Sequence, residues 1–377
     1  MHIVDTTLFF APTSGGVKRY LLAKHRFLAS QRGVTHTIVV PGAEHEPAAA
    51  GIVTIASPRI PYGHGYRLPL SMQHWSDVIC GLKPDVVEAG DPYHLAWATL
   101  KAAQRLDIPA VAFAHSDFPR VLAMRAGARA GRWADIYMRK LYSRFALVMA
   151  PSEQVAARLR QLQIKRVAVQ PLGVDTHLFH PNRRDYLFKA QLGLPPRTRV
   201  LIYAGRLSAE KQIPLLCQTA EELGSPYHLL IVGGSEKSRV TPRITFLPYE
   251  QDTVRLARLL ASADALIHAG AHETFGLVFL EAMACGRPVV GVNSGAVPEL
   301  VNDSIGRVAE PGSAKRLAQA VRYLFADDME AMGRRARQTV EKHYAWEPVF
   351  RQQLQHYARL VRADEVPGAH VSARMTS

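Results

Sequence analysis

Short apolar runs alternate with helical patterns along the first half of the chain. Such runs indicate buried strands, and apolar residues that recur every three to four positions indicate amphipathic helices. The pattern predicts strands at 38–40, 86–88, 110–113 and 147–150, and helices at 17–30 and 95–106. Strands and helices that alternate in this order form βαβ units, so we expect a parallel sheet with helices on both faces.

Turn-forming residues interrupt this rhythm between Pro171 and Asn182, and the pattern then resumes. A second set of strands is predicted at 199–205, 228–233, 243–247, 265–269 and 289–292. An amphipathic helix is expected near the C-terminus, followed by a polar tail. These limits predict a first domain over 1–170, a linker over 171–186, a second domain over 187–345, a C-terminal helix over 346–362 and a frayed tail over 363–377.

The segment 272–281, which reads His-Glu-Thr-Phe-Gly-Leu-Val-Phe-Leu-Glu, is the most informative part of the chain. It follows the predicted strand 265–269, and a helix is predicted over 277–285, ended by a Gly-Arg-Pro step. Glu273 therefore lies on a strand-to-helix loop at the carboxyl end of a parallel sheet. Open α/β sheets bind their ligands at this edge.

The start of that helix offers backbone N–H groups to an anion. These donors belong to Phe275, Gly276, Leu277 and Val278. Glu281 lies farther along the same apolar helix, where an unpaired charge would be costly. A carboxylate beside an anion site makes sense if it binds hydroxyl groups, so the implied ligand carries both phosphate and polyol, as a nucleotide sugar does. The simpler alternative is that Glu273 complements the helix dipole and Glu281 is solvated.

A second loop, Gly-Arg-Leu-Ser-Ala-Glu-Lys at 205–211, follows the predicted strand 199–205. Arg206 and Lys211 flank the start of a helix there. Two cations at this place suit a diphosphate leaving group, because preorganised positive charge stabilises the negative charge that develops on it. The alternative is a solvated pair that forms a salt bridge to Glu210.

Two features of the first half are weaker signals. Gly15 and Gly16 separate the first strand from a helix, and glycines permit both positive φ and close approach of the backbone to a phosphate. His115 stands at the end of the buried run around 110–113, where the alternative is a purely structural histidine. Ser116 follows it directly.

Together these motifs resemble those of glycosyltransferase family 4 (group 1), whose members are retaining, nucleotide-sugar-dependent enzymes with the GT-B fold. The resemblance covers about residues 1–360 and is most specific over 203–300. It implies an α/β fold of two doubly wound Rossmann-like domains that face each other across a cleft. The first domain would bind the acceptor and the second the nucleotide sugar, and the C-terminal helix would cross back to the first domain.

The resemblance also implies a role for each site residue. The catalytic residues would be His115, Glu273, Arg206 and Lys211, and the donor-binding residues would be Gly15, Gly16, Phe275, Gly276, Leu277, Val278 and Glu281. Glu273 would bind sugar hydroxyls, Glu281 the ribose, and His115 the donor sugar near its reacting carbon. In the family this histidine is usually followed directly by Asp or a similar polar residue, whereas here Ser116 intervenes before Asp117. We expect a front-face substitution with retention, because no second carboxylate stands out as a nucleophile in the first domain.

Composition adds several exclusions. A chain of 377 residues with 48% apolar residues is long enough for two domains with filled cores. Three widely spaced cysteines, Cys80, Cys217 and Cys285, predict a reducing compartment without disulfides or a zinc site. No Asp-x-Asp occurs, so we expect metal-independent transfer with no cofactor besides the nucleotide-sugar co-substrate. No apolar run is long enough to span a membrane and no signal peptide is recognisable, which predicts a cytoplasmic protein.

The basic excess indicates a polyanionic partner. The net charge is +14, from 46 basic and 32 acidic residues. Between Pro119 and Arg166, eleven Lys and Arg residues are opposed only by Asp135 and Glu153, and aromatic and aliphatic residues lie among them. An arginine-rich amphipathic helix of this kind suits peripheral contact with an anionic membrane, here the inner face of the cell membrane. A solvated face over an ordinary core helix is the alternative.

The segment 60–67 also faintly resembles bacterial mannosyltransferases that act on lipids. We therefore expect a hexose from GDP-mannose or a UDP-hexose to pass to a membrane lipid or a lipid-linked glycan. One alternative is a soluble enzyme of the same fold that acts on a small sugar or sugar phosphate. The other is a nucleic-acid-binding protein, but the chain lacks the motifs of that class, so no nucleic acid partner is expected.

Overall fold

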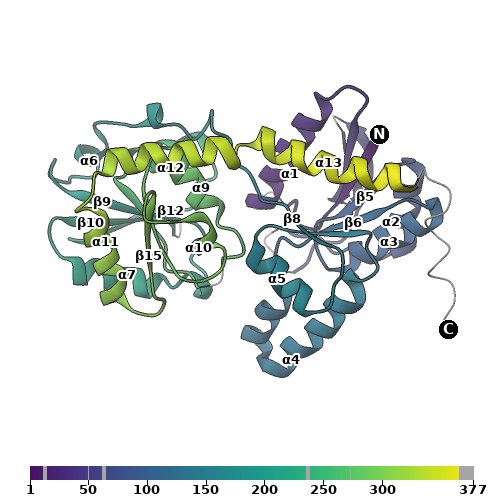
Figure 1. Cartoon of the computed structure of the whole chain (residues 1–377), viewed down its shortest axis with the longest axis horizontal. Coiled ribbons are helices and arrows are strands. Elements are labelled where there is room, and N and C mark those ends of the chain that lie inside the picture. Colours follow the sequence, from purple (N-terminus) through teal and green to yellow (C-terminus); the bar gives the residue numbers. More distant parts are fainter. Residues whose placement is uncertain (12–14, 50, 62–64, 235–237, 272, 365–377) are drawn as a thin grey trace. The chain divides into compact units, whose positions relative to one another are not determined.

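The computed structural model describes residues 1–377 apart from 12–14, 50, 62–64, 235–237, 272 and 365–377. The chain divides into two compact units, one formed by residues 1–171 and 349–377 and the other by 172–348. Each unit has helices on both faces of a mostly parallel sheet (Figure 1). This architecture confirms the predicted α/β fold of two doubly wound domains.

The first unit contains an eight-stranded sheet in the order β3-β4-β2-β1-β5-β6-β7-β8, in which β3 alone runs antiparallel to its neighbour. Its strands are β1 (His2–Thr6), β2 (Thr35–Gly42), β3 (Glu46–Ala49), β4 (Ile52–Ala56), β5 (Val86–Ala89), β6 (Ala110–Phe113), β7 (Leu147–Ala150) and β8 (Val167–Val169). Its helices are α1 (Gly16–Ala29), α2 (Met72–Gly81), α3 (His94–Leu106), α4 (Phe118–Tyr142), α5 (Glu153–Gln161) and, from Val349, α13 (Trp346–Asp364).

The central strands of this sheet are buried on both faces, as expected when helices cover a parallel sheet. Ile3 and Val4 of β1 and Val87 of β5 have no exposed surface. Two acidic residues interrupt this apolar layer, because Asp5 of β1 pairs in register with Glu88 of β5 and both are buried. Buried carboxylates require partners, which Lys24 of α1 and Tyr357 of α13 supply here.

The second unit contains a seven-stranded sheet in the order β11-β12-β10-β9-β13-β14-β15, again parallel apart from the edge pair β11 and β12. Its strands are β9 (Arg199–Ala204), β10 (Tyr227–Gly234), β11 (Arg239–Val240), β12 (Ile244–Pro248), β13 (Ala265–Ile267), β14 (Val289–Val292) and β15 (Gly306–Ala309). Its helices are η1 (Pro181–Arg183), α6 (Phe188–Gln191), η2 (Ala209–Lys211), α7 (Ile213–Leu223), α8 (Thr253–Ser262), α9 (Leu277–Ala284), α10 (Val297–Leu300), α11 (Ala314–Leu324) and α12 (Met329–His343).

The order of these strands locates a ligand-binding edge. From β9 the chain first builds β10 and β12 on one side and then returns to add β13 on the other side of β9. The sheet therefore changes winding direction between β9 and β13. Open α/β sheets bind ligands outside the carboxyl ends of the strands at such a switch point.

In two segments the structure adds detail to the sequence-based expectations. Residues 172–186, predicted as part of a linker, are grouped with the second unit. The basic segment 119–166 forms α4, β7 and α5 in succession. Helix α4 is itself interrupted at Gly127, whose φ of 84° and ψ of 171° lie outside the helical region. The strand predicted at 147–150 is confirmed as β7, and the arginine-rich helix before it has a break.

Candidate active site

Two charged residues that lie far apart in the sequence meet at the switch point of the second sheet. Lys211 ends η2, which follows β9, and Glu273 lies in the loop between β13 and α9. The Nζ of Lys211 donates to Oε2 of Glu273 at 2.5 Å, and the two side chains are 19% and 15% exposed. The alternative pairing of Lys211 with Glu210 is not what the structure has, since Glu210 accepts from Ser208 Oγ.

The carboxylate of Glu273 is held in its charged form. Burial alone would raise the pKa of Glu273, but Lys211, His268 and Arg206 together outweigh burial and leave this pKa below its ordinary value. Arg206, which is exposed, lies on the same loop as Lys211. The site therefore offers two cations and one anionic acceptor side by side, as a phosphate-bearing ligand with hydroxyl groups would require.

His268, which was not predicted from the sequence, is the fourth member of this cluster. It follows β13 and is 1% exposed. Its Nδ1 accepts the N–H of Gly270 at 3.1 Å, so the proton of the neutral ring is on Nε2, which lies 3.6 Å from Oε2 of Glu273. Burial, with a smaller contribution from Lys211, lowers the pKa of His268 to about 4 against the opposing effect of Glu273. A polar residue inside the predicted strand 265–269 was the signal that could have identified it.

Two glycines shape the backbone around Glu273. Gly276 precedes α9 with a φ of 88°, and a Cβ there would lie 3.1 Å from Cγ of Glu273. Gly295, in the turn after β14, has a φ of 63°, and a Cβ there would lie only 2.0 Å from the carbonyl oxygen of Glu273. The same turn supports this carbonyl, which accepts the N–H of Ala296 at 3.0 Å. Larger residues at either glycine would therefore displace the loop that carries Glu273.

Helix α9 places the predicted anion-binding N–H groups at the same edge. The helix begins at Leu277, and backbone N–H groups in a first helical turn have no acceptor within the helix. Phe275, immediately before it, is 3% exposed and fixes the entry of the chain. Glu281 is 5% exposed and lies just over one turn into α9. His272, at the start of the motif, lies outside the described residues.

The remaining predicted residues belong to the first unit. Gly15 caps α1 with a φ of −90°, and Gly16 is its first residue. Of the two properties that a glycine permits, Gly15 does not use a positive φ, and close approach of the backbone to a phosphate stays a prediction. His115 follows β6, where its ring stacks on Phe113 at 4.1 Å between centroids. Burial, reinforced by Lys24, lowers the pKa of His115 to about 3.

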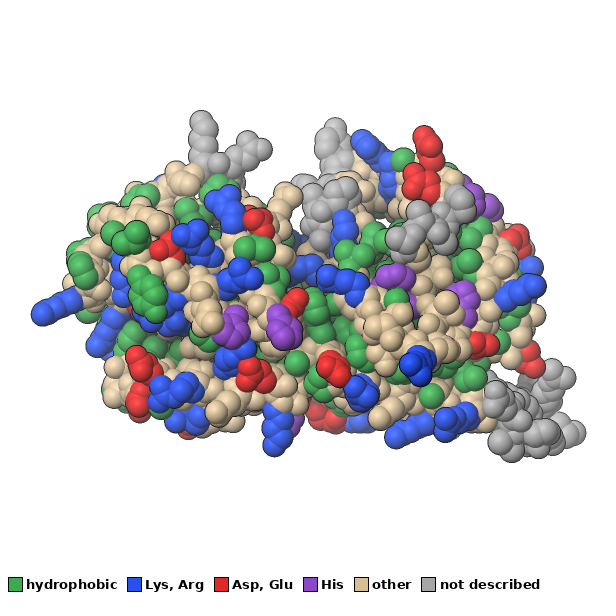
Figure 2. All heavy atoms as spheres, turned by 90° about the horizontal axis from the view of Figure 1, so that it is seen from above, with side chains coloured by type: hydrophobic (Ala, Val, Ile, Leu, Met, Phe, Trp, Pro, Cys, Tyr) green, Lys and Arg blue, Asp and Glu red, His purple; other side chains and the backbone are tan. Residues whose placement is uncertain are grey.

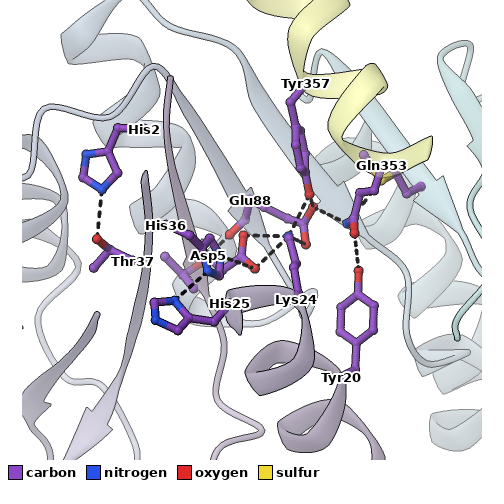
Figure 3. Close-up of polar contacts among 12 residues, drawn as sticks. His2, Asp5, Tyr20, Lys24, His25, His36, Thr37, Glu88, Gln353 and Tyr357 are labelled. Carbon is purple, nitrogen blue, oxygen red and sulfur yellow. Dashed lines mark hydrogen bonds and ion pairs between the residues drawn. The ribbon is translucent and has the colours of Figure 1, made fainter. Parts of the chain in front are cut away.

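The first unit also contains a buried polar network of Asp5, Lys24, Glu88, Gln353 and Tyr357 (Figure 3). Lys24 Nζ lies 2.7 Å from Oδ2 of Asp5, 3.1 Å from Oε1 of Glu88 and 2.7 Å from the hydroxyl of Tyr357. The Tyr357 hydroxyl and the Gln353 amide both donate to Oε2 of Glu88. These contacts join α13 to β1, β5 and α1.

The pKa values of the two buried carboxyl groups in the network shift in opposite directions. Burial is the main reason that the pKa of Glu88 is raised to about 7, whereas Lys24 and His36 hold the pKa of Asp5 at about 2 despite its burial. The network also reaches His115, because the Tyr20 hydroxyl donates to Oε1 of Gln353 at 2.7 Å and the Tyr20 ring meets His115 edge to face at 5.4 Å.

The described residues offer neither a metal-binding cluster nor a membrane-spanning helix. Nowhere in the described part of the chain do three or more His, Cys, Asp or Glu side chains come together in a way that could hold a metal ion. Within the same residues, no helix is both long and apolar enough to span a lipid bilayer.

Comparison with known proteins places both units in one group. Residues 14–178 match the model of Glycosyltransferase Family 4, and residues 187–339 match that of Glycosyl transferases group 1. The GDP-mannose-dependent alpha-(1-6)-phosphatidylinositol dimannoside mannosyltransferase of Mycobacterium tuberculosis is 29% identical over 90% of this chain and 92% of its own length. A GDP-mannose-dependent alpha-mannosyltransferase of the same species is 30% identical over 74% of this chain and 73% of its own.

Solved structures show the same fold. A sucrose-phosphate synthase from Thermosynechococcus elongatus matches with a TM-score of 0.79 at 22% identity, over 96% of this chain and 99% of that one. The Anabaena protein HepE in complex with UDP-glucose matches with a TM-score of 0.73 at 18% identity, over 96% and 100% of the two chains. Both chains therefore share the GT-B fold with this one.

Proposed function

Because the chain belongs to the family 4, group 1 glycosyltransferases, we propose that it transfers a hexose from a nucleotide-diphosphate sugar to an acceptor hydroxyl. The observation that carries this proposal is the pair formed by Lys211 and Glu273 at the switch point of the second sheet. A cation suits the diphosphate and a carboxylate suits sugar hydroxyls, and a nucleotide sugar presents both groups to one site. Without the diphosphate, the two side chains form an ion pair with each other.

In the proposed reaction the donor loses its diphosphate with retention at the sugar carbon. Lys211 and Arg206 stabilise the charge that grows on the leaving diphosphate. Glu273 accepts hydrogen bonds from sugar hydroxyls, Glu281 binds the ribose, and the neutral ring of His115 contacts the sugar. The acceptor oxygen attacks from the face that the phosphate leaves, and the leaving phosphate takes the proton of the acceptor hydroxyl.

We favour GDP-mannose as the donor, with a UDP-hexose as the alternative. The curated relatives named above are GDP-mannose-dependent, and one of them matches 90% of this chain. We propose a membrane lipid or a lipid-linked glycan as the acceptor, in keeping with the phosphatidylinositol dimannoside in the name of that relative. The alternative acceptor is a small soluble sugar or sugar phosphate.

A donor screen tests this function. The purified protein is incubated with GDP-mannose, UDP-glucose and UDP-galactose, and the released nucleoside diphosphate is measured. We expect release from GDP-mannose in the wild-type protein and little release in Lys211→Ala. Absence of release from every donor would contradict the proposal.

The same assay tests independence from metals. With excess EDTA present, we expect the rate of diphosphate release to stay unchanged, because two cationic side chains take the place of a metal ion at the leaving group. Loss of release with EDTA and recovery with Mn²⁺ or Mg²⁺ would show that this part of the proposal is wrong.

A further inference from the structure

An apolar groove opens at the carboxyl edge of the first sheet, near the ends of β1, β5 and β6. Its volume is about 580 Å³. The groove is lined by Leu8, Phe9, Ile60, Tyr66, Arg67, Leu68, Tyr93, His94, Phe118, Trp133 and Tyr137. We call it the aromatic groove, since five of these residues are Phe or Tyr and a sixth is Trp.

The walls of the aromatic groove form a chain of ring contacts. Phe9 meets Tyr66 and Tyr93 edge to face, at 6.1 and 6.0 Å between centroids. Tyr93 in turn packs against Phe118 at 5.4 Å. The hydroxyl of Tyr137 is already used, because it donates to the carbonyl of Pro92 at 2.7 Å. The walls thus present carbon surface and few groups that could hydrogen-bond to an occupant.

The rim of the groove is unusually apolar. Among the described residues of the first unit, all exposed large hydrophobic side chains come from two segments, 60–72 and 124–136. They are Ile60, Leu68, Leu70, Met72, Met124, Trp133 and Ile136, and they are 40% to 71% exposed. Three of them, Ile60, Leu68 and Trp133, also line the groove itself. An exposed apolar patch of this kind marks an interaction surface.

The same rim is positively charged. Arg129 and Lys140 of α4 are exposed, and so is Arg59 next to Ile60. Trp133 and Ile136 fall between these cations at helical spacing, on the face of α4 that carries Arg129 and Lys140. Exposed tryptophan and aliphatic side chains among arginines complement the headgroup region of an anionic lipid layer. A protein partner would have no equal need for this mixture of cations and aromatic rings.

We propose that the aromatic groove binds the hydrocarbon chain of the lipid acceptor, with its rim in the headgroup region of an anionic membrane. This inference rests on the proposed function for the identity of the acceptor. A hydrocarbon chain fits better than a sugar ring, because a sugar needs hydrogen-bond partners for its hydroxyls and the walls offer almost none. His94 and Arg67 are the polar members of the lining. Nε2 of His94 is buried and has no hydrogen-bond partner among the described residues, and it suits a lipid carbonyl or phosphate oxygen.

Binding of cis-parinaric acid, a polyene fatty acid that fluoresces in apolar surroundings, tests the groove without a membrane. The wild-type protein should bind this probe, and Leu68→Glu should weaken binding at least tenfold by placing a charge at the mouth. The matched control is Leu187→Glu, since Leu187 is 66% exposed and belongs to the second unit. We expect the control to bind like the wild type. Equal thermal unfolding midpoints would show that both variants are folded.

Two outcomes would overturn the proposal. One is equal probe binding by Leu68→Glu and the wild type. The other is displacement of the probe by methyl α-mannoside but not by palmitate, which would assign the groove to a sugar ring. Failure of the proposed function is a separate result, because it is measured as missing diphosphate release in the wild-type protein. Probe binding without diphosphate release would leave a lipid-binding groove in a protein that is not a transferase.

Discussion

At the scale of single residues, the chemistry of the site depends on what surrounds Glu273. Lys211 neutralises its carboxylate at 2.5 Å, and the Nε2 proton of His268 lies 3.6 Å from the same oxygen. An arriving diphosphate would compete for Lys211 and free the carboxylate for sugar hydroxyls. His268 cannot leave, because it is buried and its ring is fixed by Gly270. We therefore assign His268 the task of keeping Glu273 ionised and in place.

Replacement of His268 should change the pH profile of the reaction. Glu273 acts as a carboxylate, so kcat/KM should fall as the pH drops through its pKa, which the surroundings hold below its ordinary value. His268→Phe removes one group that lowers this pKa, so the acid limb should move to higher pH. His268→Asn keeps a donor and should restore part of the wild-type profile. Superimposable pH profiles for the three proteins would contradict the assignment.

The sequence predicted Glu273 and Lys211 but not their contact. The two residues are 62 positions apart, and only the order of β9 and β13 in the sheet brings their loops together. His268 was missed for a different reason. It continues an apolar run, and a histidine in such a run is equally compatible with a satisfied core position. Its role follows from two distances that a sequence does not give, from its Nδ1 to the N–H of Gly270 and from its Nε2 to Oε2 of Glu273.

At the scale of elements, buried hydrogen bonds as well as apolar contacts hold α13 against the rest of the first unit. Gln353 donates to Glu88 and accepts from Tyr20, and Tyr357 bridges Lys24 and Glu88. All of these groups are buried, so each depends on the others for its hydrogen bonds. The sequence predicted the helix from its amphipathic pattern. It could not predict the network, because Asp5 and Glu88 appear in the sequence only as interruptions of apolar strands.

Loss of Gln353 should therefore destabilise the protein measurably. Gln353→Ala leaves the Tyr20 hydroxyl without its acceptor and removes one donor from Glu88, which should cost about 1–3 kcal/mol in the free energy of unfolding. The neighbouring Gln352 is exposed and provides the control, since Gln352→Ala should change this free energy by less than about 0.5 kcal/mol. Urea unfolding measures both. Equal effects of the two substitutions would argue against a structural role of the network.

The boundaries of helices and strands were predictable where turn-forming residues mark them, and they were uncertain elsewhere. The central strands and the helices α1, α3 and α9 lie where the apolar pattern places them, within one to three residues. The strands β4, β8 and β15 were missed, as were the short edge strands β3 and β11. Strands at the sides of a sheet are short and carry less apolar surface, so their pattern is weak. The break of α4 at Gly127 was also missed, because a single glycine is tolerated in a helix.

At the scale of the whole molecule, the excess of positive charge bears on membrane binding. The net charge is +14, and Lys and Arg side chains are spread over both units on the face that Figure 2 shows. A general attraction to anionic surfaces is therefore expected from charge alone. If α4 has a specific role, its arginines must contribute more to membrane binding than the arginines of the second unit do.

Vesicle binding should separate these two effects. Changing Arg125, Arg129 and Arg132 together to Glu should abolish co-sedimentation with phosphatidylglycerol vesicles, because each basic side chain near the surface contributes about 1 kcal/mol. The control changes Lys315, Arg316 and Arg334 to Glu, which alters the net charge equally. Binding of the wild type should also weaken with salt, since the attraction decays over about 8 Å at physiological ionic strength.

Equal loss of binding in both triple variants would mean that net charge alone attracts the protein to vesicles. Absence of wild-type binding at low salt would favour the soluble acceptor instead. In either case the proposed lipid acceptor would lose its physical support, whereas the proposed use of a nucleotide sugar would be unaffected.

The most direct test of the central claim compares two lysines of the second unit. Lys211 contacts Glu273 at the switch point. Lys189 instead pairs with Asp264, with 3.0 Å between Nζ and Oδ2, and neither residue is among the proposed donor contacts. With the donor found by the screen, we predict that Lys211→Ala lowers kcat/KM for diphosphate release about a hundredfold or more. Lys189→Ala should stay within about threefold of the wild type. Near-normal turnover in Lys211→Ala, or an equal loss in both variants, would contradict the placement of the donor diphosphate at this site.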